Sequence, residues 1–260
     1  MLRSNEIRKI IQDGGMILYG QPKWTIGKNT CNTYEVFVER ARLEDGTEVP
    51  SRPIIDYIEM DPELTDVFSS WFLETALQSA KDLTEKTNVH LTLSINVLPL
   101  YCNRRDYVER VQSALAKVDF PANKLQFEIE ETQELSLAGI RNLNYLHNEL
   151  GIGLWLGNFG VGHNNLNMLT RLDLDGIELH RYFTQESHDS EQAVRLLSAI
   201  AHFADSFNIK ICAKGVETEE QMQHYEDFDF FKVQGSFIGL PMRFPELEEY
   251  IKNFAIFNDR

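Results

Sequence analysis

Short runs of apolar and β-branched residues alternate with longer amphipathic stretches along this 260-residue chain. Apolar runs of this kind, bounded by turn residues, predict buried strands. Eight strands are predicted, at residues 16–26, 33–43, 90–97, 124–129, 153–156, 176–179, 209–213 and 231–234. Only Gly27, Lys28 and Asn29 clearly separate the first two, which is too short for a helical crossover, so we expect these two strands to pair antiparallel.

Helical periodicity fills most of the gaps between the predicted strands. Helices are predicted at residues 62–83, 105–118, 136–150, 165–172, 190–207, 219–226 and 245–257. Alternating strands and helices with a parallel majority predict an α/β fold, and eight strands favour a closed TIM-like (β/α)8 barrel, with the first strand antiparallel, over a doubly wound sheet. No linker or repeat interrupts the pattern, so we expect a single barrel domain over residues 1–260.

The composition narrows the classes of partner. A formal charge of −15 makes the surface repel polyanions, so we expect no nucleic-acid partner. Cys31, Cys102 and Cys212 stand far apart without zinc spacing, which indicates neither a disulfide framework nor a zinc site. No signal-peptide core and no apolar run of about 18 residues appears, so we expect no membrane association and a cytoplasmic location.

Polar residues stand in or just after the predicted strands, where a barrel of this kind carries its chemistry. Taken singly, each is better explained as a strand-end residue that caps a helix or faces water than as a functional residue. They are Glu35, Asn96, Glu128, Asn158, Glu178, Lys214, Glu217 and Gln234.

Their order and spacing resemble one family, the EAL domains, over roughly residues 16–257. Residues 211–221 read ICAKGVETEEQ against the family's AEGVETxxQ, and residues 150–169 match its DDFGxG region. Gln234 and Gly235 with Pro241 match QGxxxxxP, and Gln21 with Pro22 matches an early QP. The resemblance implies a (β/α)8 barrel that hydrolyses cyclic di-GMP to linear pGpG with two divalent cations, usually Mg²⁺ or Mn²⁺.

The resemblance also implies a role for each matching position. Glu35, Asn96 and Glu128 stand at metal-binding positions and keep oxygen ligands. The two aspartates that follow in the family are here Gly157 and Asn158.

Two further catalytic positions are changed. The family's lysine that positions or activates the water is here Glu178, and the first glutamate of AEGVE, a ligand of the second metal, is here Lys214. Two lost carboxylates and an added ammonium should abolish binding of the second cation, so no catalytic set is intact. We expect no cofactor, or at most one weakly held Mg²⁺ or Mn²⁺ at Glu35, Asn96 and Glu128.

The remaining matches suggest substrate contacts or support. Gln21, Glu131, Glu217 and Gln234 stand at such positions. Glu39 replaces an arginine that meets a phosphate in active members, and Arg40 should point to the opposite face of its strand, which disfavours binding of cyclic di-GMP. His163, in the following loop, is better explained as a loop residue without a ligand than as a metal or base contact.

These substitutions predict a degenerate EAL domain that acts through contacts with a protein partner. The alternatives are a weak or atypical cyclic di-GMP phosphodiesterase and a cyclic di-GMP sensor without turnover. Exposed apolar positions in residues 165–172 are candidates for a homodimer contact. Since Glu178 and Lys214 exchange the charges of the family, we also expect these two side chains to form an ion pair of reversed polarity.

Overall fold

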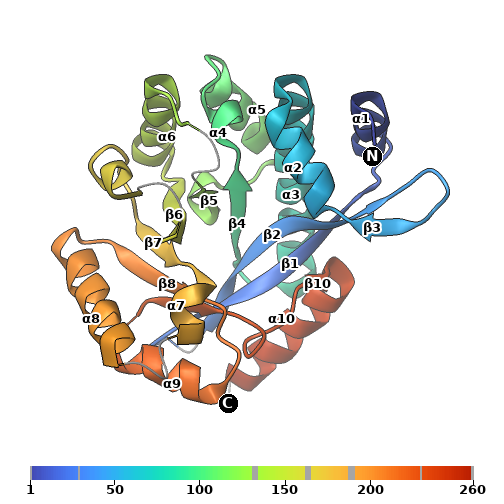
Figure 1. The fold of residues 1–260 in the computed structure, drawn as a ribbon. Helices are drawn as coiled ribbons and strands as arrows, with labels where there is room; N and C mark the ends of the chain where they lie inside the picture. Colours follow the sequence, from blue (N-terminus) through green and yellow to red (C-terminus); the bar gives the residue numbers. More distant parts are fainter. Residues whose placement is uncertain are drawn as a thin grey trace.

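The computed structural model describes residues 2–28, 30–130, 134–161, 165–186, 191–228 and 230–258. Eight strands close into a barrel, and helices surround most of it (Figure 1). This confirms the predicted TIM-like α/β barrel. The eight barrel strands are β1 (Met16–Thr25), β2 (Thr30–Arg42), β4 (Thr92–Val97), β5 (Leu125–Ile129), β6 (Gly153–Phe159), β7 (Gly176–Leu179), β8 (Lys210–Lys214) and β9 (Lys232–Gln234).

The strand β1 runs against both of its barrel neighbours. It pairs antiparallel with β2 on one side and with β9 on the other, and the remaining barrel pairs from β2 to β9 are parallel. The turn-rich connection between β1 and β2 therefore has the predicted effect. Two short strands, β3 (Glu48–Pro50) and β10 (Met242–Arg243), extend the sheet beyond the barrel.

Eight α-helices are the main ones around or beside the barrel in the described residues: α1 (Ser4–Gln12), α2 (Arg52–Met60), α3 (Pro62–Thr87), α5 (Tyr107–Val118), α6 (Leu137–Leu150), α8 (Glu191–Ser206), α9 (Glu219–Asp227) and α10 (Phe244–Asn258). Shorter pieces are α4 (Pro99–Cys102), η1 (Ala122–Lys124) and α7 (Arg181–Glu186). The helix predicted at residues 165–172 is wrong in type, because only a 3-10 helix, η2 (Asn165–Thr170), lies there. The elements α1, α2, α4, α7, β3 and β10 were not predicted from the sequence.

Local signals explain where the helices begin. The Asp61 side chain accepts hydrogen bonds from the backbone of Glu63 and Leu64 and so caps α3, and Asn88 ends that helix in the left-handed region. At α9, Thr218 and Gln221 form a reciprocal capping box. The ETxxQ part of the matched motif therefore has a structural role as a helix start.

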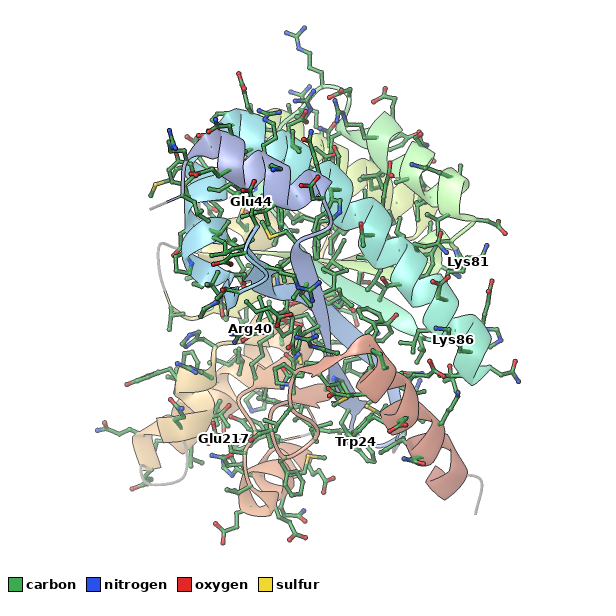
Figure 2. The ribbon with its side chains drawn as sticks, turned by 90° about the vertical axis from the view of Figure 1, so that its right-hand side faces the viewer. Trp24, Arg40, Glu44, Lys81, Lys86 and Glu217 are labelled. Carbon is green, nitrogen blue, oxygen red and sulfur yellow. The ribbon has the colours of Figure 1, made fainter. Side chains whose placement is uncertain are left out.

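Alternation along the strands divides their side chains between the barrel interior and the helical layer. Ser94 and Glu128 meet inside the barrel, so Ile95 and Phe127 face outward. The long α3 helix, which carries Lys81 and Lys86 along its length (Figure 2), covers this outer face. At the other side, Trp24 meets Phe254 of α10 edge-on, with ring centroids 5.3 Å apart. Within the described residues, none of the helices has the length and apolar character needed to cross a membrane.

Candidate functional site

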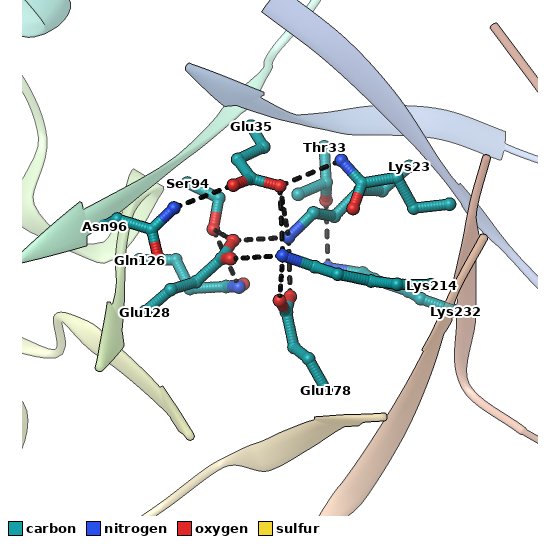
Figure 3. A network of polar contacts seen from close by, with 11 residues as sticks. Lys23, Thr33, Glu35, Ser94, Asn96, Gln126, Glu128, Glu178, Lys214 and Lys232 are labelled. Atoms are coloured by element: carbon teal, nitrogen blue, oxygen red, sulfur yellow. Dashed lines mark hydrogen bonds and ion pairs between the residues drawn. The ribbon is translucent and has the colours of Figure 1, made fainter. Parts of the chain in front are cut away.

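Three glutamates and two lysines from five strands meet inside the upper part of the barrel (Figure 3). We call this group the lysine–glutamate cluster. Its members are Lys23 of β1, Glu35 of β2, Glu128 of β5, Glu178 of β7 and Lys214 of β8. The barrel thus brings together four positions that the sequence singled out and one, Lys23, that it did not.

Lys214 contacts all three carboxylates. Its Nζ lies 2.7 Å from Glu178, 3.0 Å from Glu128 and 3.2 Å from Glu35. The contact with Glu178 is to its Oε2 and is the shortest of the three. The predicted ion pair of reversed polarity between Glu178 and Lys214 is therefore present.

Lys23 contacts the same three carboxylates as Lys214. Its Nζ bonds to Glu128, lies 2.5 Å from Glu178 Oε1 and is 3.9 Å from Glu35. The side chain is completely buried. The signal in the sequence was a lone lysine within the apolar strand MILYGQPKWT, but only the closure of the barrel shows which groups it meets.

Glu35 is held by two side-chain amides as well. Asn96 Nδ2 donates to its Oε1 at 2.8 Å, and Gln234 Nε2 donates to its Oε2 at 2.9 Å. This orients Asn96 so that its Oδ1 is buried without a hydrogen-bond partner in the described residues. Gln234, predicted as a supporting residue, thus positions a carboxylate of the cluster.

Burial and the neighbouring charges shift the pKa values of the glutamates in the cluster. Burial opposes charge on Glu128, but the ammonium groups of Lys214 and Lys23 outweigh it and hold the pKa of Glu128 well below its usual range. Burial, with the adjacent Glu128 carboxylate, raises the pKa of Glu178 to about 7. Three carboxylates face two ammonium groups, so one carboxylate is in excess. The raised pKa identifies Glu178 as the carboxylate that takes up a proton most readily.

A layer of polar side chains lies beneath the cluster. Ser94 donates to Glu128 and accepts from Gln126 Nε2 at 2.9 Å. Lys232 donates to Thr33 Oγ1 at 3.0 Å, and burial together with Lys23 lowers the pKa of Lys232 to about 8. These contacts pair the polar groups of the barrel centre with one another.

The space above Gly157 is taken by a different carboxylate. A Cβ placed on Gly157 would lie 3.1 Å from Cγ of Glu130, which follows β5. Burial raises the pKa of Glu130, while Lys214 acts in the opposite direction. Glu130 was not among the site residues predicted from the sequence, because only the pairing of β5 with β6 brings it beside Gly157. Asn158, at the second altered position, adopts a left-handed conformation with φ of 50°.

The other predicted residues lie around the mouth. Gln21 Nε2 donates to the carbonyl of Gly239 at 3.0 Å, and Glu217 is exposed on the surface (Figure 2). Glu39 lines the mouth, whereas the Arg40 guanidinium donates to the Glu48 carbonyl at 2.9 Å. Glu131 and His163 lie outside the described residues.

A cavity of about 710 Å³ opens above the cluster. Its polar part is lined by Gln21, Glu35, Glu39, Asn96, Glu130, Asn158, Lys214, Glu217 and Gln234. This volume suits a small molecule. Among the described residues, no group of three histidine, cysteine or acidic side chains is arranged to hold a metal ion.

Comparison with known proteins gives consistent results. The family model described as "EAL domain" matches residues 4–241. The cyclic di-GMP phosphodiesterase NbdA of Pseudomonas aeruginosa is 25% identical over 96% of this chain and 32% of its own length, and the cyclic di-GMP phosphodiesterase PdeR of Escherichia coli is 22% identical over 95% of this chain and 37% of its own. The chain spans about a third of the length of these relatives.

Solved structures share the fold. The EAL enzyme Bd1971, in a form with cAMP and cyclic di-GMP bound, has a TM-score of 0.88 at 21% identity, covering 95% of this chain and 68% of that one. The PaMucR phosphodiesterase in complex with cyclic di-GMP has a TM-score of 0.82 at 22% identity, covering 94% and 98%. With the match to the family model over most of its length, this chain belongs to the EAL domain family.

Proposed function

We propose that this EAL domain has no cyclic di-GMP phosphodiesterase activity and acts through contacts with a protein partner. One observation carries the proposal: two lysine ammonium groups contact the carboxylates that would have to bind the metal ions. Lys23 and Lys214 both lie within ion-pair distance of Glu35 and Glu128.

The residues at this site fit a pair of divalent cations poorly. Asn96 Oδ1 is a buried, unpartnered acceptor among the described residues and would suit one cation. Against it, Glu35 and Glu128 already bond to ammonium groups, and the second-metal positions carry Asn158 and Lys214 in place of acids. We derive no hydrolytic step through metal ions at this site.

Electrostatic magnitudes support this assignment. A divalent cation about 3.5 Å from one ammonium is repelled by on the order of 10 kcal/mol at an effective dielectric constant near 20. Two buried lysines would have to leave the carboxylates or lose their protons before a metal entered, and both have pKa values raised above the usual range by these carboxylates despite their burial. The cluster therefore supplies internally the positive charge that metal ions would bring.

Exposed apolar side chains near the mouth support a protein partner. Tyr182 follows β7 and is 53% exposed, while Phe237 and Leu240 follow β9 and are 45% and 64% exposed. Loops after parallel strands lie at one end of the barrel, so these side chains belong to the same end as the cavity. Exposed large apolar groups gathered at one end are typical of an interaction surface.

The cavity favours one second candidate, a sensor that binds cyclic di-GMP without cleaving it. Its size and the nucleotide complexes of the related structures support this alternative. The acidic side chains that line it, among them Glu39, Glu130 and Glu217, act against binding of a dianion and outnumber the cationic Arg52, Arg181 and Lys214.

The test combines binding and turnover. Cyclic di-GMP is titrated calorimetrically into the protein with Mn²⁺ present, and the mixture is then analysed for pGpG by chromatography, with an active EAL phosphodiesterase as the positive control. We expect neither heat nor pGpG. Binding without product would favour the sensor, and pGpG above the level of a protein-free blank would overturn the proposal.

A further inference from the structure

The cavity extends beyond the barrel mouth into an apolar lobe between the barrel wall and the helical layer. The lobe is lined by Phe68, Phe72, Leu73, Ile95, Tyr107 and Phe127. Ile95 and Phe127 belong to the outer faces of β4 and β5, and Phe68, Phe72 and Leu73 come from α3. We infer that this apolar lobe binds an uncharged apolar molecule, an alkyl chain or a ring system that carries one hydrogen-bonding group.

Apolar side chains enclose the lobe on both sides. Phe68 and Phe72 are stacked with ring centroids 5.6 Å apart, and Tyr107 lies against Phe127 at 6.4 Å. All four are buried. Protein interiors hold few voids larger than a water molecule, and an apolar void of about 150 Å³ is enough to bind benzene. The whole cavity, polar part included, has a volume of about 710 Å³, and the apolar lobe is one part of it. We therefore take the lobe as a binding site for an apolar ligand.

A buried hydroxyl supplies the second observation. Tyr107 is 1% exposed, and apart from the adjacent Cys102 thiol its hydroxyl oxygen has no hydrogen-bond partner among the described residues. Burial raises the pKa of this hydroxyl, and the Cys102 thiol adds to the shift. A thiol is a weak hydrogen-bonding partner, so a ligand with one stronger hydrogen-bonding group would stabilise this buried hydroxyl. This points to an alcohol, ketone or amide on an apolar body.

The charge of the cavity disfavours an anionic occupant. Five glutamates line it, Glu35, Glu39, Glu59, Glu130 and Glu217, against three cationic side chains, Arg52, Arg181 and Lys214. A carboxylate or phosphate at the head of an apolar chain would face this acidic surplus. The expected ligand is thus neutral, which separates it from a cyclic dinucleotide.

The probe is N-phenyl-1-naphthylamine, a neutral dye whose emission rises in apolar surroundings. Titrated into the intact chain, it should bind saturably with one site, and 1-decanol should displace it at a concentration at least about tenfold below that of decanoate. Absence of saturable binding, or equal displacement by decanoate, would overturn the inference.

Variants locate the site. Ser69, buried on α3, also lines the lobe, and Ser69→Phe should fill it and weaken dye binding at least about tenfold. The matched control is Ser79→Phe, the same change on α3 at a half-buried position outside the cavity, which should leave binding unchanged. If circular dichroism shows that Ser69→Phe is unfolded, Leu73→Trp replaces it as the variant that fills the lobe. Undiminished binding to a folded lobe variant would place the dye elsewhere and sink the inference.

Discussion

Lys23 and Glu178 meet in the closed interior of the barrel, where the Lys23 ammonium nitrogen lies 2.5 Å from Glu178 Oε1 and neither side chain has exposed surface. The strands that carry them, β1 and β7, are not neighbours in the barrel. The contact therefore crosses the barrel interior. Each of these buried charges needs the other, because a buried charge without an oppositely charged partner destabilises the fold.

Removing Lys23 should destabilise the fold strongly. Lys23→Met leaves Glu128 and Glu178 with one ammonium fewer, and loss of one member of a buried ion pair typically costs about 3–5 kcal/mol. The free energy of unfolding from urea titration measures this. The control is Lys86→Met, since Lys86 is 62% exposed and pairs with Glu248 at 3.8 Å, so its loss should cost less than about 1 kcal/mol. Equal effects of the two changes would contradict the assigned role of the cluster.

Exchanging the charges of Glu178 and Lys214 tests the coupling within the cluster. Glu178→Lys alone should lower the melting temperature, because it places a third ammonium beside Lys23 and Lys214. Adding Lys214→Glu restores one ion pair but leaves the ammonium introduced at position 178 facing Lys23, so recovery should be partial. Further replacement of Lys23 by Met should lower the melting temperature again, because three carboxylates would then face a single ammonium. Strictly additive effects of the three changes would argue against direct coupling.

Lys232 should make stability depend on alkaline pH. Burial and Lys23 lower its folded-state pKa to about 8, against an ordinary value of 10.5, so the folded protein releases the proton first as pH rises. The stabilising contribution of this shift is present above pH 10.5 and is lost as pH falls through 8. Relative to Lys232→Met, the wild type should gain roughly 3 kcal/mol between pH 8 and 10.5. Urea unfolding at several pH values measures both proteins, and a constant difference would contradict the shift.

Restoring acidic ligands should not restore metal binding while Lys23 remains. In the double change Asn158→Asp with Lys214→Glu, Lys23 still bonds to Glu128 and Glu178, so we expect no rise in melting temperature with millimolar Mn²⁺. Adding Lys23→Met leaves the carboxylates without a buried ammonium in contact, and Mn²⁺ should then raise the melting temperature by mass action. A matched titration with Na⁺ at equal ionic strength controls for screening. Stabilisation of the wild type by Mn²⁺ at the same concentration would contradict the proposed exclusion of metal.

The periodicity of apolar residues and the positions of turn residues were sufficient to predict the barrel, because strands and helices follow from local residue spacing. All eight barrel strands lie within or beside the predicted ranges, and the Glu178 and Lys214 substitutions indicated their ion pair before any coordinates. The error at residues 165–172 arose because apolar periodicity over one or two turns does not distinguish an α-helix from a 3-10 helix.

The sequence by itself determined the architecture, the family resemblance and the loss of acids at positions 157, 158 and 214. The tertiary structure alone decided that Lys23 joins the lysine–glutamate cluster and that Glu130 fills the space above Gly157. The physical reason is that strand periodicity tells which face a side chain occupies, whereas the partner across a closed barrel depends on strand register and on the antiparallel direction of β1. Those follow from the packing of the whole sheet.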